Sequence, residues 1–257
     1  MYVIDYNDFC SVKSFNSCVR FLVLHYTATN FERSRKSLTD DNVIIHYLVP
    51  DISDESYIQA GFKSMRIFNL VDEHEPVSTV GVNSWAKCTN INDMSIGIKI
   101  VNLATDKDGI WHFPPYPDVQ IATVKQLAAN IIQRHPDISP TNVVAHSDIA
   151  PTRMSDPGPE FPWLALHEVG IGAWYDMDTK VRFSKEFTEK GLPTKAELIS
   201  HFSTYGYDAT IASTDSGYQY LVRAFQLHFR ANNFDGNVDI ETAAILYALV
   251  EKYFLTV

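Results

Sequence analysis

Short apolar runs alternate with helix-like segments over the first 176 residues, and this alternation constrains the fold more than any other feature of the chain. Runs rich in β-branched and aromatic residues predict strands at residues 20–26, 43–49, 67–71, 95–101 and 143–145. Helices are expected at 33–38 and at 119–135, where apolar residues recur at helical spacing until Pro136. Interleaved strands and helices are typical of an α/β sheet domain.

The last third of the chain has a different pattern. Helices are expected at residues 194–205, 216–229 and 240–254, after a polar connector at 178–193. Thr194 and Glu197 are spaced as a capping box, and the run DIET at 239–242 is a weaker form of the same signal. We therefore expect two domains, residues 1–180 and a small helical domain at 181–257, whose apolar helix faces form its core.

Composition excludes some partners. The 257 residues carry a formal charge of −10 and contain no Lys/Arg-rich stretch, which argues against nucleic acid or an anionic membrane as the main partner. No run is long and apolar enough to span a bilayer, and the first 18 residues lack the pattern of a signal peptide. Cys10 and Cys18 can form a disulfide only in an oxidising compartment; free thiols, with Cys88, are the alternative.

The segment from His146 to Trp163, HSDIAPTRMSDPGPEFPW, predicts a metal site. Its imidazole and the carboxylate of Asp156 stand ten residues apart in a loop that four prolines stiffen by fixing φ. His25, at the end of the apolar run FLVLHY, supplies a third ligand from a strand. Two histidines and one carboxylate, without a fourth ligand, are typical of a catalytic zinc site with a position open for water.

The other histidines fit structural roles better. His46, on the second expected strand, is either an outer-shell residue, a rival ligand or a packed histidine, and packing is the favoured interpretation. Six more lie in polar or helical settings and are interpreted as surface or packing residues: His74, His112, His135, His167, His201 and His228.

The strings LVLHYTA, HYLV, NDMSIGI and AHSDIAPTRMSDPGPEFPW resemble the zinc N-acetylmuramoyl-L-alanine amidases of the AmiD/AmpD kind. The tail strings AFQLHFR and FDGNVDIETAAILYAL are similar to the peptidoglycan-binding module that follows the amidase domain in such proteins. The resemblance runs in order from about residue 21 to the end of the chain. It implies a mixed central sheet flanked by helices, a three-helix C-terminal domain, and Zn²⁺ held by His25, His146 and Asp156.

The family reaction that this resemblance implies is hydrolysis of the amide between N-acetylmuramic acid and L-alanine. It uses a glutamate as base and a lysine that stabilises the oxyanion. The family's SIGIE is SIGIK here, so Lys99 stands at the glutamate position, and Met154 stands at the lysine position beside a retained Arg153. Thr79 stands where relatives have the histidine of a WHAG-like segment. Arg153 and Thr79 are candidate substrate contacts.

Two roles for Lys99 stay open. A nearby cation favours the neutral amine, which can act as a base, or the ammonium can bind a carboxylate of the peptide stem. Three functions are accordingly compared: an amidase-type protein that acts on peptidoglycan or muropeptides with impaired or altered activity, an inactive peptidoglycan-binding pseudoenzyme, and a secreted protein repurposed for another amide or a host partner. The resemblance implies the cell envelope or periplasm; secretion without a classical signal is the alternative. The oligomeric state stays open.

Overall fold

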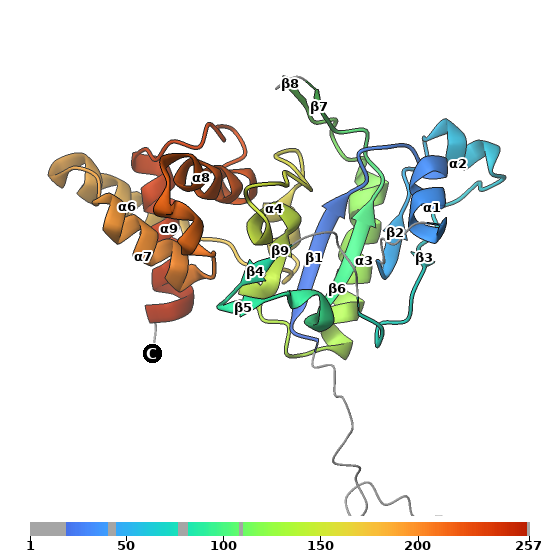
Figure 1. The fold of residues 1–257 in the computed structure, drawn as a ribbon, viewed down its shortest axis with the longest axis horizontal. Coiled ribbons are helices and arrows are strands. Elements are labelled where there is room, and N and C mark those ends of the chain that lie inside the picture. The colour runs from blue at the N-terminus through green and yellow to red at the C-terminus, as the bar shows by residue number, and fades with distance from the viewer. Residues whose placement is uncertain (1–18, 41–44, 77–81, 108–109, 256–257) are drawn as a thin grey trace, which may run out of the picture.

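A five-stranded mixed sheet lies at the centre of the chain, with helices on both faces (Figure 1). The computed structural model describes residues 19–40, 45–76, 82–107 and 110–255. The strand order is β3-β2-β6-β1-β9, where β1 is Phe21–Tyr26, β2 is Tyr47–Val49, β3 is Phe68–Asn69, β6 is Ser95–Ile100 and β9 is Val143–Ala145. The inner pairs are parallel, and β3 joins β2 antiparallel at one edge. The expected α/β fold with a mixed sheet flanked by helices is confirmed.

Each expected strand is present, although four are shorter than the sequence indicated, β1 and β6 by one residue each. The second strand begins at Tyr47, and residues 41–44 of the expected run 43–49 lie outside the described part of the chain. The third strand is only Phe68–Asn69 because it pairs with β2 alone. The centre of the sheet, β1 and β6, is buried along nearly its full length, which explains its continuous apolar runs.

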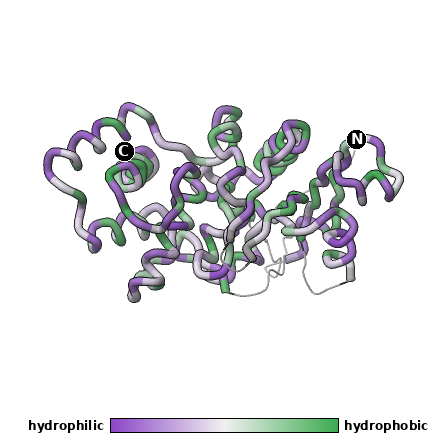
Figure 2. The backbone as a smooth tube through the Cα atoms, turned by 90° about the horizontal axis from the view of Figure 1, so that it is seen from above, coloured by the Kyte–Doolittle hydropathy of each residue, from purple (hydrophilic) through white to green (hydrophobic). Residues whose placement is uncertain are grey.

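Helix α3 (Asp118–Arg134) covers one face of the sheet. Its buried residues Val124, Leu127 and Ile131 pack with Leu24 of β1 and Ile98 of β6 in one apolar cluster. Helices α1 (Phe31–Asp40) and α2 (Glu55–Gln59) pack with Leu48 and Val101 at the β2 side of the molecule. Hydrophilic and hydrophobic residues alternate along the helices at the periphery of the molecule (Figure 2), as is typical of amphipathic helices.

Short elements connect these layers. Two small hairpins are β4–β5 (Ser84–Trp85, Cys88–Thr89) and β7–β8 (Thr105–Lys107, Ile110–His112). The remaining short helices are η1 (Ile91–Met94), η2 (Pro140–Asn142), α4 (His146–Ile149) and α5 (Trp163–His167). Among the described residues, no helix is both long and apolar enough to cross a membrane.

The tail contains α6 (Met177–Lys190), α7 (Lys195–Tyr205), η3 (Ala209–Ser213), α8 (Asp215–Phe229), α9 (Ile240–Val250) and a last π-helical turn, η4 (Glu251–Leu255). Thr194 and Glu197 form the expected capping box at the start of α7. The interpretation of 178–193 as a connector is wrong, because this segment is most of helix α6. Its polar surface hides an apolar stripe: Phe183 and Phe187 pack edge-on against Tyr247 of α9.

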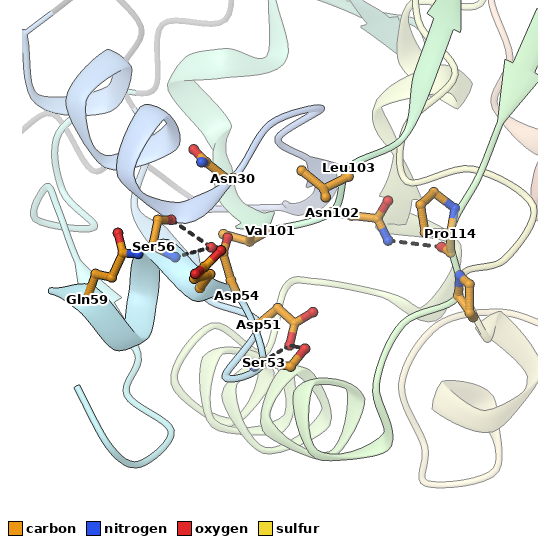
Figure 3. A pocket seen from close by; sticks show the side chains of 12 residues that line it. Asn30, Asp51, Ser53, Asp54, Ser56, Gln59, Val101, Asn102, Leu103 and Pro114 are labelled. Atoms are coloured by element: carbon orange, nitrogen blue, oxygen red, sulfur yellow. Dashed lines mark hydrogen bonds between the residues drawn. The ribbon is translucent and has the colours of Figure 1, made fainter. Parts of the chain in front are cut away.

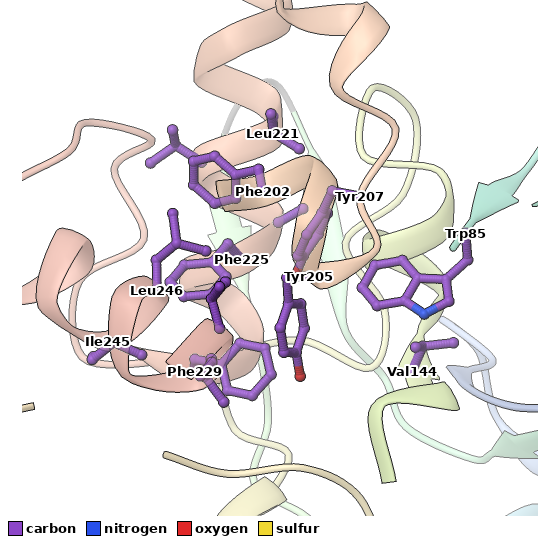
Figure 4. Close-up of a cluster of buried hydrophobic side chains, with 14 of the residues drawn as sticks. Trp85, Val144, Phe202, Tyr205, Tyr207, Leu221, Phe225, Phe229, Ile245 and Leu246 are labelled. Atoms are coloured by element: carbon purple, nitrogen blue, oxygen red, sulfur yellow. The ribbon is translucent and has the colours of Figure 1, made fainter. Parts of the chain in front are cut away.

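The tail and the sheet share one hydrophobic core, in which hairpin β4–β5 packs against the tail (Figure 4). Trp85 of this hairpin is fully buried and lies edge-on to Tyr207, with ring centroids 4.7 Å apart. A Cβ at Gly206, whose φ is +139°, would lie 2.8 Å from the Trp85 ring, so only glycine permits this approach. The tail is therefore packed onto the sheet domain through an apolar contact at this hairpin.

A half-buried carboxylate, Glu73, ties β2 to the end of α3. Glu73 accepts hydrogen bonds from Tyr47, 2.6 Å away, and from Arg134 and His135. Burial raises the pKa of Glu73, but these donors outweigh it and lower the pKa from 4.5 to about 2. Because the folded pKa is depressed, the stabilisation is present above about pH 4.5 and is lost as the pH falls towards 2.

We expect Glu73→Gln to lower the free energy of unfolding at pH 7, because it removes the charge that these donors stabilise. The expected loss is only about 2 kcal/mol, because Arg134 is partly exposed and solvent screens its charge. Urea unfolding of both proteins between pH 7 and pH 3 measures this difference, which should shrink below pH 4.5. Glu189→Gln, at an exposed position of α6, is the matched control. A difference that stays constant with pH would contradict the role of the Glu73 charge.

Candidate metal centre

Two neighbouring strands and one short helix bring the candidate ligands together. His25 lies near the carboxyl end of β1, beside Lys99 of β6 in the parallel register. On the other side of β1, strand β9 ends at Ala145, and His146 is the first residue of α4. Because the carboxyl ends of parallel strands meet at one edge, the two imidazoles lie side by side, with ring centroids 4.4 Å apart.

The proline-rich loop after α4 folds back towards the sheet, so that Asp156 lies beside the two histidines. The N–H of Ser147 donates to the carbonyl of Asp156 at 3.0 Å, and the hydroxyl of Tyr116 donates to the carbonyl of Pro157 at 2.8 Å. Gly158 has φ +81°, and a Cβ there would lie 2.8 Å from the ring of Phe113. A side chain at this position would displace the loop, so glycine is required next to the candidate ligand.

The three side chains form a compact cluster in the interior. Nδ1 of His25 lies 3.1 Å from Oδ2 of Asp156, and Nδ1 of His146 lies 3.0 Å from the same oxygen. All three residues are buried, with exposed fractions of 1% for His25, 7% for His146 and 5% for Asp156. The geometry thus brings together the three residues that the sequence selected as ligands.

Electrostatics favour the protonation states that a metal requires. Burial, with the neighbouring imidazole of His146, lowers the pKa of His25 to about 4, against the opposing effect of Asp156. Burial raises the pKa of the Asp156 carboxyl, but His146 and His25 outweigh it and lower that pKa well below its usual range. Neutral imidazole and ionised carboxylate are the forms that bind metals.

The donor set fits a divalent ion such as Zn²⁺. A tetrahedral ion with bonds of about 2.0–2.2 Å separates its ligand atoms by roughly 3.3–3.6 Å. One ligand atom from each of His25, His146 and Asp156 lies within 4.8 Å of the other two, so small rotations suffice. An ionised carboxylate can only accept hydrogen bonds. In the metal-free chain, the Nδ1 atoms of His25 and His146 must therefore both carry a hydrogen in order to donate to Asp156. An ion would satisfy all three groups at once.

Lys99 lies next to this cluster on the same face of the sheet as His25. It is half-buried, and burial lowers the pKa of its ammonium against the opposing effect of Asp156. The neighbouring side chains that act on the pKa of His25 are His146, Asp156 and Lys99. A cation, not a second carboxylate, thus occupies the position beside His25.

The other sequence candidates lie at different distances from this centre. Met154 is half-buried and packs against the core shared with the tail. The guanidinium of Arg153 donates to the carbonyl of Val82 at 2.8 Å, so it contacts the segment before β4. Thr79 lies outside the described residues, as do Cys10 and Cys18; Cys88 is half-buried on β5.

His46 is a packed histidine and not a ligand. It is fully buried; its Nδ1 accepts from the N–H of Gly97 and its Nε2 lies 3.0 Å from the carbonyl oxygen of Glu75. Tyr116 and Asp148 are site neighbours that sequence reasoning missed. Tyr116 lies at the end of a proline-rich stretch, which gave no indication of its place. Asp148 lies in the segment from His146 to Trp163, and this position was the one sequence signal that it is close to the candidate ligands.

A separate cavity of about 450 Å³ opens at the carboxyl ends of β2 and β6 (Figure 3). Val101 and Asn102, just after Lys99, contribute to its wall. Two of its acidic residues have structural partners: Asp51 accepts from the N–H of Ser53, and Asp54 accepts from the N–H groups of Phe31 and Ser56 in the first turns of α1 and α2. His25, His146 and Asp156 are not among the residues that line this cavity.

Comparison with known proteins identifies the family of this chain. The profile of the N-acetylmuramoyl-L-alanine amidase family, Amidase_2, matches residues 15–159, which contain all three candidate ligands. The chain belongs to this amidase family. N-acetylmuramoyl-L-alanine amidase AmiD of Escherichia coli K12 is 41% identical over 237 residues, covering 91% of this chain and 83% of AmiD.

Solved structures extend the similarity of this amidase-family chain over the tail. The crystal structure of AmpDh3 from Pseudomonas aeruginosa has a TM-score of 0.92 and 53% identity, covering 98% of this chain and 99% of AmpDh3. AmpDh3 is also known in complex with anhydromuramic pentapeptide. E. coli AmiD, solved with anhydro-N-acetylmuramic acid-L-Ala-D-γ-Glu-L-Lys, has a TM-score of 0.82 and 38% identity, covering 96% of this chain and 93% of AmiD. The tail is thus part of the shared fold.

Proposed function

We propose that this amidase-family chain binds Zn²⁺ through His25, His146 and Asp156 and recognises muropeptides, but hydrolyses their lactyl–L-alanine amide slowly. The observation that carries this proposal is the pairing of three buried ligand side chains with Lys99 in register beside His25. Relatives solved with anhydromuropeptides support the substrate class.

The site has the residues to bind the metal but lacks a residue that can act as the base. Bound zinc would polarise the scissile carbonyl and lower the pKa of a water molecule. Asp156 and the two histidines hold the metal, and none of them is free to take the proton of that water. Lys99 is the side chain nearest to that task, yet its ammonium form carries no lone pair. Without a positioned base, the hydrolysis loses about 10²–10⁴ in rate.

Met154 cannot stabilise the oxyanion, which is the second contribution to the rate that this site lacks. A cation at this position would stabilise the oxyanion that forms when water adds to the amide, and losing one such donor costs about 10²–10³ in rate. The thioether of Met154 packs against apolar neighbours and carries no positive charge. Binding of the muropeptide depends less than hydrolysis on a base and an oxyanion donor. We therefore expect the chain to bind muropeptide but to hydrolyse it slowly.

An inactive muropeptide-binding pseudoenzyme is the second candidate, supported by the same two substitutions. A protein repurposed for another amide or a host partner is the third. The retained ligands favour the first two, because an unused metal site would erode. We also propose the cell envelope as the compartment, by analogy with the family.

Metal analysis and substrate digestion test the proposal. We expect purified protein to hold about one zinc per chain, and calorimetry to show binding of an anhydromuropeptide. Overnight digestion, followed by mass spectrometry, should release little stem peptide. Rapid release by the wild type would overturn the impaired-site proposal, and absence of binding would overturn the substrate class.

The tail, residues 181–257, is proposed to add affinity for the wall. Retention of the full chain on insoluble peptidoglycan, compared with a carrier protein of equal charge, measures this. The whole chain is the appropriate sample, because the tail shares its core with the sheet domain. Retention no greater than that of the carrier would exclude a wall-binding role.

A further inference from the structure

A buried carboxylate joins the metal-bearing loop to the helical tail. Asp148 of α4 is fully buried, and its two oxygens accept three hydrogen bonds among the described residues. The N–H of Ala145 donates at 2.8 Å, the hydroxyl of Tyr207 at 2.6 Å and Nδ1 of His228 at 2.7 Å. Two of these donors come from the tail. Buried carboxylates are costly unless they are bonded in this way, so the tail is needed to keep Asp148 where it is.

The bond to Ala145 fixes the start of α4. Ala145 is the last residue of β9, and the next residue is the candidate ligand His146. By accepting from the Ala145 N–H, Asp148 caps the helix and sets the direction in which His146 leaves the strand. The position of His146 therefore depends on the position of Asp148.

Asp156 is the one polar partner of the His146 ring among the described residues. Metal-binding histidines ordinarily donate their second ring nitrogen to a carboxylate or carbonyl, which orients the ring. Nε2 of His146 is buried and has no hydrogen-bond partner in the described part of the chain. The orientation of the ring therefore depends on its backbone, on the contact of Nδ1 with Asp156 and on the contact with the His25 ring.

The same histidine of the tail also contacts the far end of the metal loop. The ring of His228 stacks on Trp163, with centroids 3.7 Å apart. Trp163 follows Asp156 by seven residues, at the end of the proline-rich segment. Helix α8 thus touches the loop at Asp148, before Asp156, and at Trp163, after it.

We propose that Tyr207 and His228 are positioning residues for the metal centre: through Asp148 they hold His146 in its ligating position. The tail is then part of the scaffold of the metal site, in addition to any affinity for the wall. This inference rests on the proposed zinc site. The Asp148–His228 pair is too buried for an acid–base role in catalysis, because only 3% of His228 and none of Asp148 is exposed to solvent.

Zinc affinity of the full chain tests the inference. Competition with a chromophoric chelator gives the dissociation constant, and the melting temperature of the metal-free protein reports folding. We expect Tyr207→Phe and His228→Leu each to weaken zinc binding about 10-fold, the lower end of the range for outer-shell partners. His228→Asn should restore most of the affinity, since its amide nitrogen can donate from the position of Nδ1.

Tyr205→Phe is the matched control, because Tyr205 is buried in the same aromatic cluster but is not a donor to Asp148. It should alter the melting temperature of the metal-free protein without changing zinc affinity. Wild-type affinity in Tyr207→Phe and His228→Leu, when the wild type binds zinc, overturns the positioning role alone. Equal loss in His228→Asn and His228→Leu also overturns it. A wild type that binds no zinc overturns the metal site and this inference together.

Discussion

Replacing Lys99 by glutamate should raise the rate of amide hydrolysis by at least about 10²-fold, at the lower end of the contribution of a positioned general base. Lys99 stands in register with His25, so a carboxylate there would face the water at the metal. Release of the stem peptide from an anhydromuropeptide, followed by mass spectrometry under single-turnover conditions, gives the rate. Adding Met154→Lys should give a further increase of about 10²-fold, because it supplies a cation for the oxyanion.

The control for this experiment is Lys99→Gln, which removes the charge of Lys99 without supplying a base. If removing the cation alone accelerates the reaction, Lys99 inhibits by its charge and not by the lack of a base. A wild-type rate equal to that of Lys99→Glu would show that Lys99 is itself a competent base. The gains of the two substitutions need not multiply, since both act on one transition state.

Zinc should stabilise the wild type strongly, and Asp156→Asn should abolish the effect. At a free zinc concentration of about 1,000 times the dissociation constant, a ligand that binds only the folded state adds about 4 kcal/mol. For a chain of this size, that corresponds to a rise in melting temperature on the order of 10 °C. Asp156 supplies the only carboxylate of the ligand cluster among the described residues, and an amide is a poor substitute for it.

Calorimetric melting in EDTA and in buffered zinc measures both proteins. Asp178→Asn, at an exposed position near the start of α6, serves as the control and should keep the full zinc response. A zinc response of the same size in Asp156→Asn would mean that the metal binds elsewhere. The comparison is independent of catalysis, so it stays informative even if the protein turns over no substrate.

Local pattern predicted the elements well where burial is continuous. Strands β1 and β6 are sandwiched between layers, so nearly every residue is apolar and the run is visible in one sequence. The capping box at Thr194 was equally visible, because it joins residues three apart. Helix α6 was missed because its apolar stripe is narrow: Phe183 and Phe187 stand in a segment that is otherwise mostly charged and polar. Their packing partner, Tyr247, lies on the distant helix α9, so the pattern of the segment itself does not indicate that it is packed.

The sequence by itself selected the candidate ligands. His25, His146 and Asp156 were recognisable as candidates because each stands in a stiff, locally readable setting. The flanking residues also marked Lys99 and Met154 as predicted departures from the family pattern.

Only the tertiary structure shows what surrounds the candidate ligands. Asp148 meets Tyr207 and His228 across 59 and 80 residues of chain, and no periodicity links such distant positions. In the sequence, His228 was interpreted as a surface or packing residue, because its hydrogen bond depends on a carboxylate from another element. These hydrogen bonds between buried groups require the tail to be packed on the sheet, which is why local sequence carries no trace of them.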